Sequence, residues 1–551
     1  MIRIIRAKIL IFILVVATIL RLWDLGGTPI HLTSDEVALG YNAYSIIKTA
    51  KDEHGVLLPI IFESFHDFKP GLYVYVTAPF VALFGLNEFT TRLPGAISGI
   101  VAVWLLYLVV GELFKEKKSL QIFSALLLAI SPWHIHFSRG AWEAGISLTL
   151  TLAGIYFFLR SIKDKPRWFI LSALFFGLTL ITYQGAKLSS GIVVLGLIIS
   201  YVKQLLLISK KTIFISVVVG IIVSSPVLLS FGTEKTGRLE VFSIFSYPRP
   251  QGVVDHILSQ GEETNISLTY LLFHSEQLHF VKGILSRWIN HYSPRFLFFE
   301  GDWSHHNLSV PRIGAILFID IVFLIAGIVV LARTRFNPAV FFIGYWFLIA
   351  PLPAALSRDS INAIRSLNLV LPLTIMLALG ATFIWEKVGL KRVFVFVFLS
   401  LYIANFIFFI EGYFVHMNVR SAKYWQYGYK QVVEKVTEVQ KNYHQIIFVQ
   451  SYDQPYIFFL FYQKYDPSLY QSKVHLVASH NPLDVGFVEK LDNINFELID
   501  WPSHRGRSGA LFIGNTEQIP PVDSNDPNKF KLLDEIKYPN GEIVFRIVEV
   551  L

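Results

Sequence analysis

Residues 70–85 read PGLYVYVTAPFVALFG, and the topology of the chain depends on whether this stretch crosses a membrane. Of the 551 residues, 53% are hydrophobic and only 16% are charged, which lies far outside the range of soluble globular proteins. We therefore interpret the chain as a membrane protein. Residues 70–85 are apolar, but Pro79 interrupts them and Tyr73 and Tyr75 lie near their start, a composition that suits the membrane interface.

Other apolar stretches have the roughly 17 to 25 residues needed to cross a bilayer, counting their flanks. They lie at 7–23, 92–113, 119–134, 143–160, 167–183, 188–207, 212–230, 312–332, 338–356, 366–385 and 393–411. The first follows basic residues but precedes no cleavage site of small residues. We therefore interpret it as a retained span and not as a cleaved signal peptide.

Short basic clusters separate these stretches and decide their orientation. The clusters are Arg3/Arg6/Lys8, Lys115/Lys117/Lys118, Arg160/Lys163/Lys165/Arg167, Lys203/Lys210/Lys211, Arg333/Arg335 and Lys387/Lys391/Arg392. If residues 70–85 do not cross, all clusters fall on one side, which the positive-inside bias assigns to the cytoplasm. If they cross, every later cluster lies opposite the amino terminus. We therefore predict about 11 spans, with residues 70–85 in the outer interface.

This topology predicts a multi-pass cell-membrane protein with a cytoplasmic amino terminus and a polar outer mouth. The predicted outer segments are 24–91, 135–142, 184–187, 231–311, 357–365 and the tail from about residue 412. Ionisable residues of both signs gather in them, whereas the cytoplasmic loops carry little besides Lys and Arg. We expect the functional site on the extracytoplasmic face.

The tail changes character and predicts a second domain. Residues 427–443 have apolar residues at helical spacing, and strand-like runs follow at 446–450, 495–500, 510–514 and 542–550. We predict an all-α polytopic membrane bundle over residues 1–411, with surface helices in its first outer loop. A small exported α/β domain follows over residues 412–551.

Charge and composition exclude several classes of function. The net charge of +8 reflects the clusters that set topology, so we expect no nucleic-acid partner. The chain has no cysteine, which excludes disulfides, thiolate metal sites and cysteine nucleophiles. It has no GxxxxGK[ST] phosphate loop, and we expect no nucleotide cofactor.

The first outer segment contains HLTSDEVALGYNAYSIIKTA at residues 31–50. Thr33 and Glu36 fit a capping box, and Asp35 suits the first turn of a helix because of the helix dipole. The helix would lie on the membrane surface through a stripe of Val37, Tyr41, Tyr44 and Ile47. Capping alone would explain both acids, but it does not exclude a chemical role.

Two further outer stretches add charged residues. FHDFKPGLYVY (65–75) places Lys69 at the membrane surface, and SPWHIHFSRGAWEAG (131–145) carries Arg139 and Glu143 four residues apart. That pair is either a structural salt bridge or part of an acid/base or metal site. Three carboxylates near several cations suit a substrate with an anionic phosphate and a hydroxyl to be deprotonated.

As a set, these motifs resemble the GT-C glycosyltransferases of the protein O-mannosyltransferase and aminoarabinose-transferase group. The resemblance rests on the DE pair, KPGLY, NEFTTRLPG (87–95), SPWHIHFSR, RFLFFEGDWSHHN (295–307) and INAIRSLNLVLP (361–372), and it covers roughly residues 1–411. It implies inverting transfer of one sugar from a polyprenyl-phosphate carrier to an acceptor on the outer face.

The resemblance also implies residue roles. Asp35 resembles the catalytic aspartate, Glu36 completes the acidic pair, and Glu143 matches an acidic position where relatives more often have Asp. Lys69 resembles the lysine that meets the carrier phosphate, and Arg365 matches an arginine near that phosphate.

Further contacts are expected around these residues. Arg139 would add to the phosphate contacts, and substrate contacts are expected from Asp67, Tyr41, His305 and His306. The two histidines would donate to phosphate, bind a divalent ion or simply be exposed. Some relatives have Glu-Lys-Pro-Pro in the lysine loop, whereas this chain has Asp67-Phe68-Lys69, with the acid one residue earlier, and Gly71 in place of the second proline.

The expected partners are a polyprenyl-phosphate-linked sugar, the bilayer, and an acceptor that is a protein, a lipid or a glycan; a divalent metal ion stays open. One alternative is a transporter or flippase of lipid-linked sugars, which should carry ionisable residues deep in its spans. Another is a polymerase or ligase that uses the same carrier. Asp320 lies inside 312–332 and is a carrier-site residue, a packing group or a transporter feature.

Overall fold

The computed structural model describes residues 2–115, 117–230, 243–335, 337–387, 392–450, 454–473, 476–477 and 486–551. Lys391 and residues 231–242 of the predicted outer loop lie outside them. The chain forms two compact units. Unit 1 comprises 1–17, 100–137 and 147–409, and unit 2 comprises 18–99, 138–146 and 410–551.

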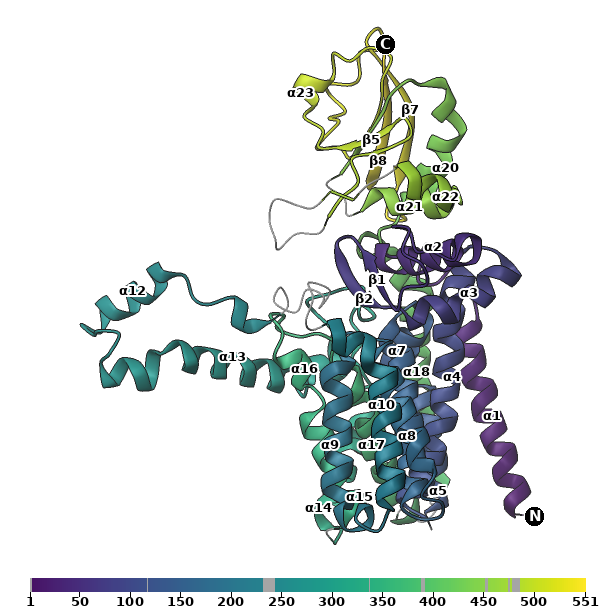
Figure 1. Cartoon of the computed structure of the whole chain (residues 1–551), viewed down its shortest axis with the longest axis vertical. Coiled ribbons are helices and arrows are strands. Elements are labelled where there is room, and N and C mark those ends of the chain that lie inside the picture. The colour runs from purple at the N-terminus through teal and green to yellow at the C-terminus, as the bar shows by residue number, and fades with distance from the viewer. Residues whose placement is uncertain are drawn as a thin grey trace. The chain divides into compact units, whose positions relative to one another are not determined.

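Helices account for most of the described chain (Figure 1). Up to residue 230 they are α1 (Ile2–Leu22), α2 (Ser34–Thr49), α3 (Leu72–Phe84), α4 (Glu88–Leu113), α5 (Lys118–Ala129), α6 (Pro132–Arg139), α7 (Glu143–Ser161), α8 (Trp168–Leu180), α9 (Ala186–Leu205) and α10 (Lys210–Ser230). From residue 243 on they are α12 (Gln251–Gln260), α13 (Glu276–Asn290), α14 (Asp320–Arg333), α15 (Pro338–Ile349), α16 (Leu352–Ala355), α17 (Val370–Lys387), α18 (Arg392–Glu411), α19 (Met417–Arg420), α20 (Tyr429–Val439), α21 (Pro455–Tyr462), α22 (Pro467–Lys473) and α23 (Trp501–His504).

Each apolar stretch predicted to span the membrane contains a helix. Within the described residues, seven helices are long and apolar enough to cross a bilayer, or eight if the bent pair α5 and α6 is one span. The others are shorter or more charged: α8 has 13 residues, α14 has 14, and α1 carries four basic residues. The multi-pass membrane bundle is confirmed, while its sidedness stays a prediction.

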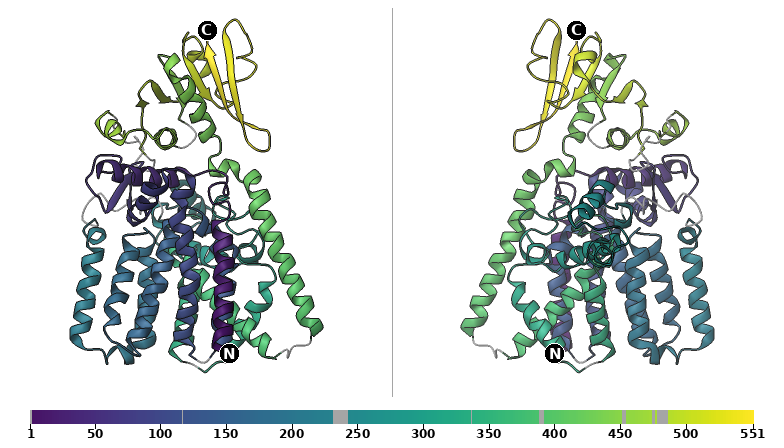
Figure 2. Two further views of the ribbon diagram at one scale, coloured as in Figure 1. Left: turned by 90° about the vertical axis from the view of Figure 1, so that its right-hand side faces the viewer. Right: turned by 90° about the vertical axis from the view of Figure 1, so that its left-hand side faces the viewer.

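In unit 1 the helices α8, α9 and α10 lie side by side, as both views of Figure 2 show. Among the candidate spans of the described residues, the one that contains α17 is the most enclosed, since 89% of its apolar window is buried. Helix α17 meets α14 closely through two glycines. A Cβ at Gly327 would lie 2.0 Å from the Met376 carbonyl oxygen, and one at Gly380 would lie 1.9 Å from that of Phe323. Small residues at this crossing let the two backbones approach.

Asp320 lies at the start of α14 and bonds to a neighbouring helix. It is buried, and its carboxylate accepts hydrogen bonds from the Tyr402 hydroxyl of α18 (2.9 Å) and the Leu317 amide (3.1 Å). Of the three interpretations of Asp320, the structure favours a hydrogen bond between helices.

In unit 2, the stretch 70–85 contains the 13-residue helix α3, with Pro79 inside it. At 1.5 Å per residue it is about 20 Å long, shorter than the roughly 30 Å hydrocarbon core. It packs against α2. This length fits the predicted interfacial position.

The described part of the tail forms one six-stranded sheet in the order β4-β5-β3-β6-β8-β7. The strands are β3 (Ile446–Val449), β4 (Lys490–Leu491), β5 (Ile494–Glu497), β6 (Leu511–Gly514), β7 (Phe530–Lys537) and β8 (Ile543–Val550). Strand β3 runs parallel to β5 and β6, and all residues of β3 and β6 are buried, as expected for central strands. The α/β character of the tail is confirmed.

Helix α2 begins with the predicted capping box, in which Thr33 accepts from the Glu36 amide and Glu36 accepts from the Thr33 amide. Its neighbours in unit 2 include α3 and tail helix α21. Gly40 permits the close approach, because a Cβ there would lie 2.7 Å from the Phe461 ring. Part of the apolar stripe assigned to the membrane surface is therefore covered by the tail.

Candidate functional site

A short hairpin in unit 2 positions Lys69. Strands β1 (Ile61–Ser64) and β2 (Asp67–Pro70) are antiparallel, with Ser64 opposite Asp67. The two turn residues, Phe65 and His66, have positive φ angles of 57° and 64°, the geometry of a tight type I′ turn. Because side chains alternate along a strand, Asp67 and Lys69 share one face of the hairpin.

The hairpin brings Lys69 to the first turn of α2. The Lys69 ammonium donates to the Asp35 carboxylate in an ion pair, in which the Asp35 side chain is 51% exposed and that of Lys69 is 24% exposed. Both residues line one pocket with Asn42, Ser64 and Glu143. The structure thus brings together Asp35, Lys69 and Glu143, which are far apart in the sequence.

The charges around this pocket are mainly negative. Burial alone would lower the pKa of Lys69, but the carboxylates of Asp35, Asp67 and Glu143 raise it above its ordinary value. Lys69 therefore stays protonated at any physiological pH. Glu143 is the first residue of α7, where the helix dipole favours a carboxylate.

Gly71 has no room for a side chain. A Cβ at Gly71 would lie 2.1 Å from Cδ2 of Phe62. The Phe62 ring is buried and lines the same pocket, opposite Lys69 in the hairpin register. Glycine lets the chain turn from β2 into α3 beside this ring.

Glu36 points away from the pocket into a buried network. One oxygen accepts from Nε of Arg92 (2.9 Å) and from the Ala141 amide (2.8 Å). The other accepts from Nη2 of Arg92 (3.2 Å) and from the Thr33 amide (3.0 Å). Both side chains of this ion pair are fully buried.

Arg139 holds backbone and aromatic groups of unit 2. Its guanidinium donates to the carbonyl oxygens of Leu20 (3.0 Å), Asp24 (3.2 Å) and Thr28 (2.8 Å). It also stacks over the Phe414 ring, 4.7 Å from its centre. No ion pair between Arg139 and Glu143 occurs in the described structure. Arg139 and Glu143 are four residues apart, but the chain breaks between α6 and α7 in this interval, so the two side chains do not share one helix.

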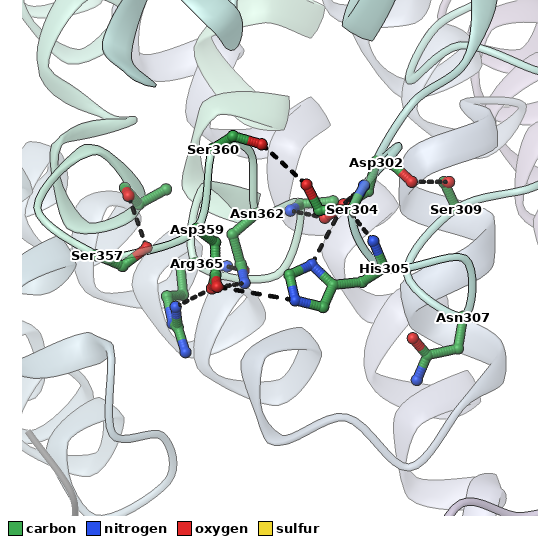
Figure 3. Close-up of polar contacts among 12 residues, drawn as sticks. Asp302, Ser304, His305, Asn307, Ser309, Ser357, Asp359, Ser360, Asn362 and Arg365 are labelled. Atoms are coloured by element: carbon green, nitrogen blue, oxygen red, sulfur yellow. Dashed lines mark hydrogen bonds and ion pairs between the residues drawn. The ribbon is translucent and has the colours of Figure 1, made fainter. Parts of the chain in front are cut away.

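The remaining predicted residues lie elsewhere. The buried Tyr41 donates from its hydroxyl to the Tyr465 carbonyl oxygen (3.2 Å) and faces the tail. His305 and Arg365 lie in unit 1, in a second polar cluster that Figure 3 shows. His306 is exposed beside it.

This second cluster is built on two aspartates (Figure 3). The buried Asp302 accepts from the amides of His305 (2.9 Å) and Ala363 (2.8 Å). The His305 ring lies 3.3 Å from Asp302 and 3.9 Å from Asp359. Arg365 donates to Asp359 at 2.5 Å. The hydrogen bond to Asp302 raises the pKa of His305, which favours its charged form.

Sequence analysis missed two buried residues of unit 2. Arg92 lies within the quoted NEFTTRLPG, and its position at the start of an apolar span indicates an internal partner. Glu53 lies in the loop after α2 and is fully buried. A polar loop residue carries no periodic signal, so Glu53 could not be found from the sequence.

Among the described residues, no group of three or more His, Asp or Glu side chains is arranged to hold a metal ion. The pocket acids instead surround the Lys69 ammonium.

Comparisons with known proteins agree with the resemblance stated from the motifs. Residues 69–229 match the family model described as dolichyl-phosphate-mannose-protein mannosyltransferase. The structure is similar to that of ArnT from Cupriavidus metallidurans bound to undecaprenyl phosphate, with 12% identity, a TM-score of 0.56, and coverage of 98% of this chain and 97% of that chain. The apo form of ArnT gives a TM-score of 0.54 at the same identity and coverage.

An oligosaccharyltransferase from Archaeoglobus fulgidus is also similar, with 12% identity, a TM-score of 0.48, and coverage of 84% of this chain and 64% of that chain. No curated protein matches the chain. The likeness to ArnT confirms that the chain has a fold like that of ArnT over nearly its whole length.

Proposed function

We propose that the chain is a glycosyltransferase that moves a single sugar from a polyprenyl-phosphate carrier to an acceptor hydroxyl on the extracytoplasmic face, with inversion. The observation that supports this most is the ion pair of Asp35 and Lys69 in a pocket that also contains Glu143. A half-exposed carboxylate beside a lysine held in its charged form offers a base for the hydroxyl and a cation for the phosphate.

In this proposal Asp35 accepts the proton of the acceptor hydroxyl as its oxygen attacks the anomeric carbon. The bond between that carbon and the phosphate oxygen breaks, and the carrier leaves as polyprenyl phosphate. Attack from the face opposite the phosphate gives inversion. Because the phosphate leaves ionised, no general acid is needed.

Lys69 would offset the charge that develops on the leaving phosphate. In the free protein Lys69 is paired with Asp35, so binding of the phosphate would draw the ammonium away and free the carboxylate to act as base. Removing a preorganised donor of this kind typically costs roughly 3–4 kcal/mol of transition-state stabilisation.

The other predicted residues receive roles that follow their contacts. Glu36 and Arg139 would position the first outer loop, because their polar atoms bond to Arg92 and to backbone carbonyls. Glu143 and Asp67 would hold Lys69 charged. Arg365 and His305 of unit 1 are proposed as a second contact for the anionic carrier.

The test is transfer by purified protein in lipid nanodiscs, supplied with a labelled polyprenyl-phosphate sugar and candidate acceptors, with and without chelator. We expect release of polyprenyl phosphate and an inverted product. Asp35→Asn should abolish transfer while carrier binding survives, and Asp523→Asn, at an exposed position of the tail, should match the wild type.

Lys69→Met should weaken use of the carrier, and the exposed Lys51→Met is its matched control. Full turnover by Asp35→Asn would refute the proposed base. Movement of the intact lipid-linked sugar across the bilayer, without release of the carrier phosphate, would identify a transporter instead.

A further inference from the structure

Glu53 is a buried carboxylate that the proposed reaction does not use. It lies in the loop between α2 and the β1–β2 hairpin, and its side chain is 0% exposed. Burying a carboxylate is costly unless its oxygens find partners. The contacts of the Glu53 side chain therefore show which parts of the first outer loop it connects.

These contacts tie Glu53 to α2. Its backbone amide donates to Oδ1 of Asn42 (2.9 Å), and Nδ2 of Asn42 donates back to Oε1 of Glu53 (3.3 Å). Asn42 is buried and lies seven residues, about two helical turns, after Asp35. Both residues therefore lie on one face of α2, and both line the pocket.

The same oxygen ties Glu53 to the hairpin. Oγ of Ser64 donates to Oε1 of Glu53 at 3.4 Å. Ser64 is buried, lines the pocket and lies opposite Asp67 in the register that sets Lys69. Oε1 of Glu53 thus receives one donor from the helix that carries the proposed base and one from the hairpin that carries the lysine.

The second oxygen, Oε2, is buried and has no hydrogen-bond partner among the described residues. Burial raises the pKa of Glu53 to about 7. A neutral carboxyl satisfies the same bonds at Oε1, since both are accepted there. Glutamine would keep an acceptor oxygen in this place without the charge.

We propose that Glu53 is a positioning residue that ties α2 to the β1–β2 hairpin and so sets the geometry between Asp35 and Lys69. The inference rests on the proposed function, because the geometry matters only if these two residues act on one substrate. Displacing a reacting group by about 1 Å can cost on the order of 100-fold in rate.

Two variants test by kinetics whether Glu53 ties α2 to the hairpin. Glu53→Ala removes the acceptor oxygen that Asn42 and Ser64 share. We expect its kcat to fall on the order of 100-fold and its KM for the carrier to change little. The concentration of active sites in each preparation is measured by carrier binding. Glu53→Gln should restore kcat to within about threefold of the wild type. The control is Glu63→Gln on the same hairpin, whose carboxylate pairs with His66 outside the pocket.

A distance measurement tests the tie without catalysis. Because the chain has no cysteine, spin labels on Lys48→Cys of α2 and His66→Cys of the hairpin, both exposed, report one distance. We expect a narrow distribution in the wild type and in Glu53→Gln, and a broad one in Glu53→Ala.

The outcomes separate the two proposals. If the wild type releases no carrier phosphate, the proposed function fails, whatever the labels show. If it does, but Glu53→Ala keeps both its kcat and a narrow distribution, the tie is refuted. A Gln variant as slow as the Ala variant would also refute it, because the proposed tie needs only the acceptor oxygen.

Discussion

Replacing Glu36 by Gln separates the two acids of the DE pair. Each carboxylate oxygen of Glu36 accepts two hydrogen bonds, from Arg92 and from the amides of Thr33 and Ala141. In glutamine one oxygen becomes an NH₂ group, which would face two donors. The substitution also leaves the Arg92 guanidinium buried without its counter-ion.

Although Glu36→Gln replaces only one oxygen by nitrogen, we expect it to reduce the free energy of unfolding considerably. Removing one partner of a buried ion pair destabilises proteins by about 3–5 kcal/mol, because an uncompensated charge stays buried. At about 2 °C per kcal/mol for a large domain, Glu36→Gln should lower Tm on the order of 5–10 °C. Asp35→Asn should leave Tm within about 1 °C, since Asp35 is half exposed and pairs at the surface of the pocket.

The assay is thermal unfolding in detergent, followed by intrinsic tryptophan fluorescence, together with transfer at a temperature where both variants are folded. We expect Glu36→Gln to be unstable but active and Asp35→Asn to be stable but inactive. The double variant Glu36→Met with Arg92→Met should recover part of the lost stability. A Glu36→Gln protein with wild-type Tm and no transfer would show that Glu36 takes part in the chemistry.

Three further predictions follow from local contacts. Gly71→Ala should slow transfer and lower Tm, because its methyl group would overlap the Phe62 ring, and equal kinetics in a transfer assay would contradict this steric argument. His305 has a raised pKa through its bond to Asp302, so its contribution to stability is fully present below its ordinary pKa and is lost as the pH rises through the raised value. The Tm advantage of the wild type over His305→Gln should therefore shrink from pH 6 to pH 9, and a constant difference would count against it. Asp320→Asn keeps an oxygen that can accept the hydrogen bond from Tyr402, so this variant should retain transfer activity in nanodiscs. Loss of transfer with an unchanged Tm would instead indicate that Asp320 belongs to the carrier site.

The sequence predicted the bundle because span length and basic clusters follow from the bilayer itself. An apolar run and its flanking charges are local features, so each predicted span contains a helix in the structure. Asp35, Lys69 and Glu143 could be grouped because the topology put their loops on one side, and they do line one pocket. Their roles stay predictions.

The partners of the buried polar residues could not be predicted. Arg139 and Glu143 are four residues apart, but the chain breaks between α6 and α7, and Arg139 bonds to carbonyls near residues 20–28 instead. Glu53 accepts hydrogen bonds from Asn42 and Ser64 only because the loop after α2 brings its side chain between them. Such contacts depend on tertiary packing, which neither residue spacing nor periodicity encodes.

The apolar stripe on α2 shows why amphipathic spacing does not identify what packs against the apolar face. Amphipathic spacing in residues 31–50 indicates only that one face leaves water, and a bilayer and a protein domain satisfy it equally well. In unit 2 the tail covers part of this face: Tyr41 bonds to the Tyr465 carbonyl, and the Ser34 amide donates to the Gln426 side chain at 2.6 Å. Since Ser34 directly precedes Asp35, the tail helps to fix the first turn of the helix that carries the proposed base. The tail, predicted from the sequence as a separate exported α/β domain, therefore contributes to the geometry of the proposed site.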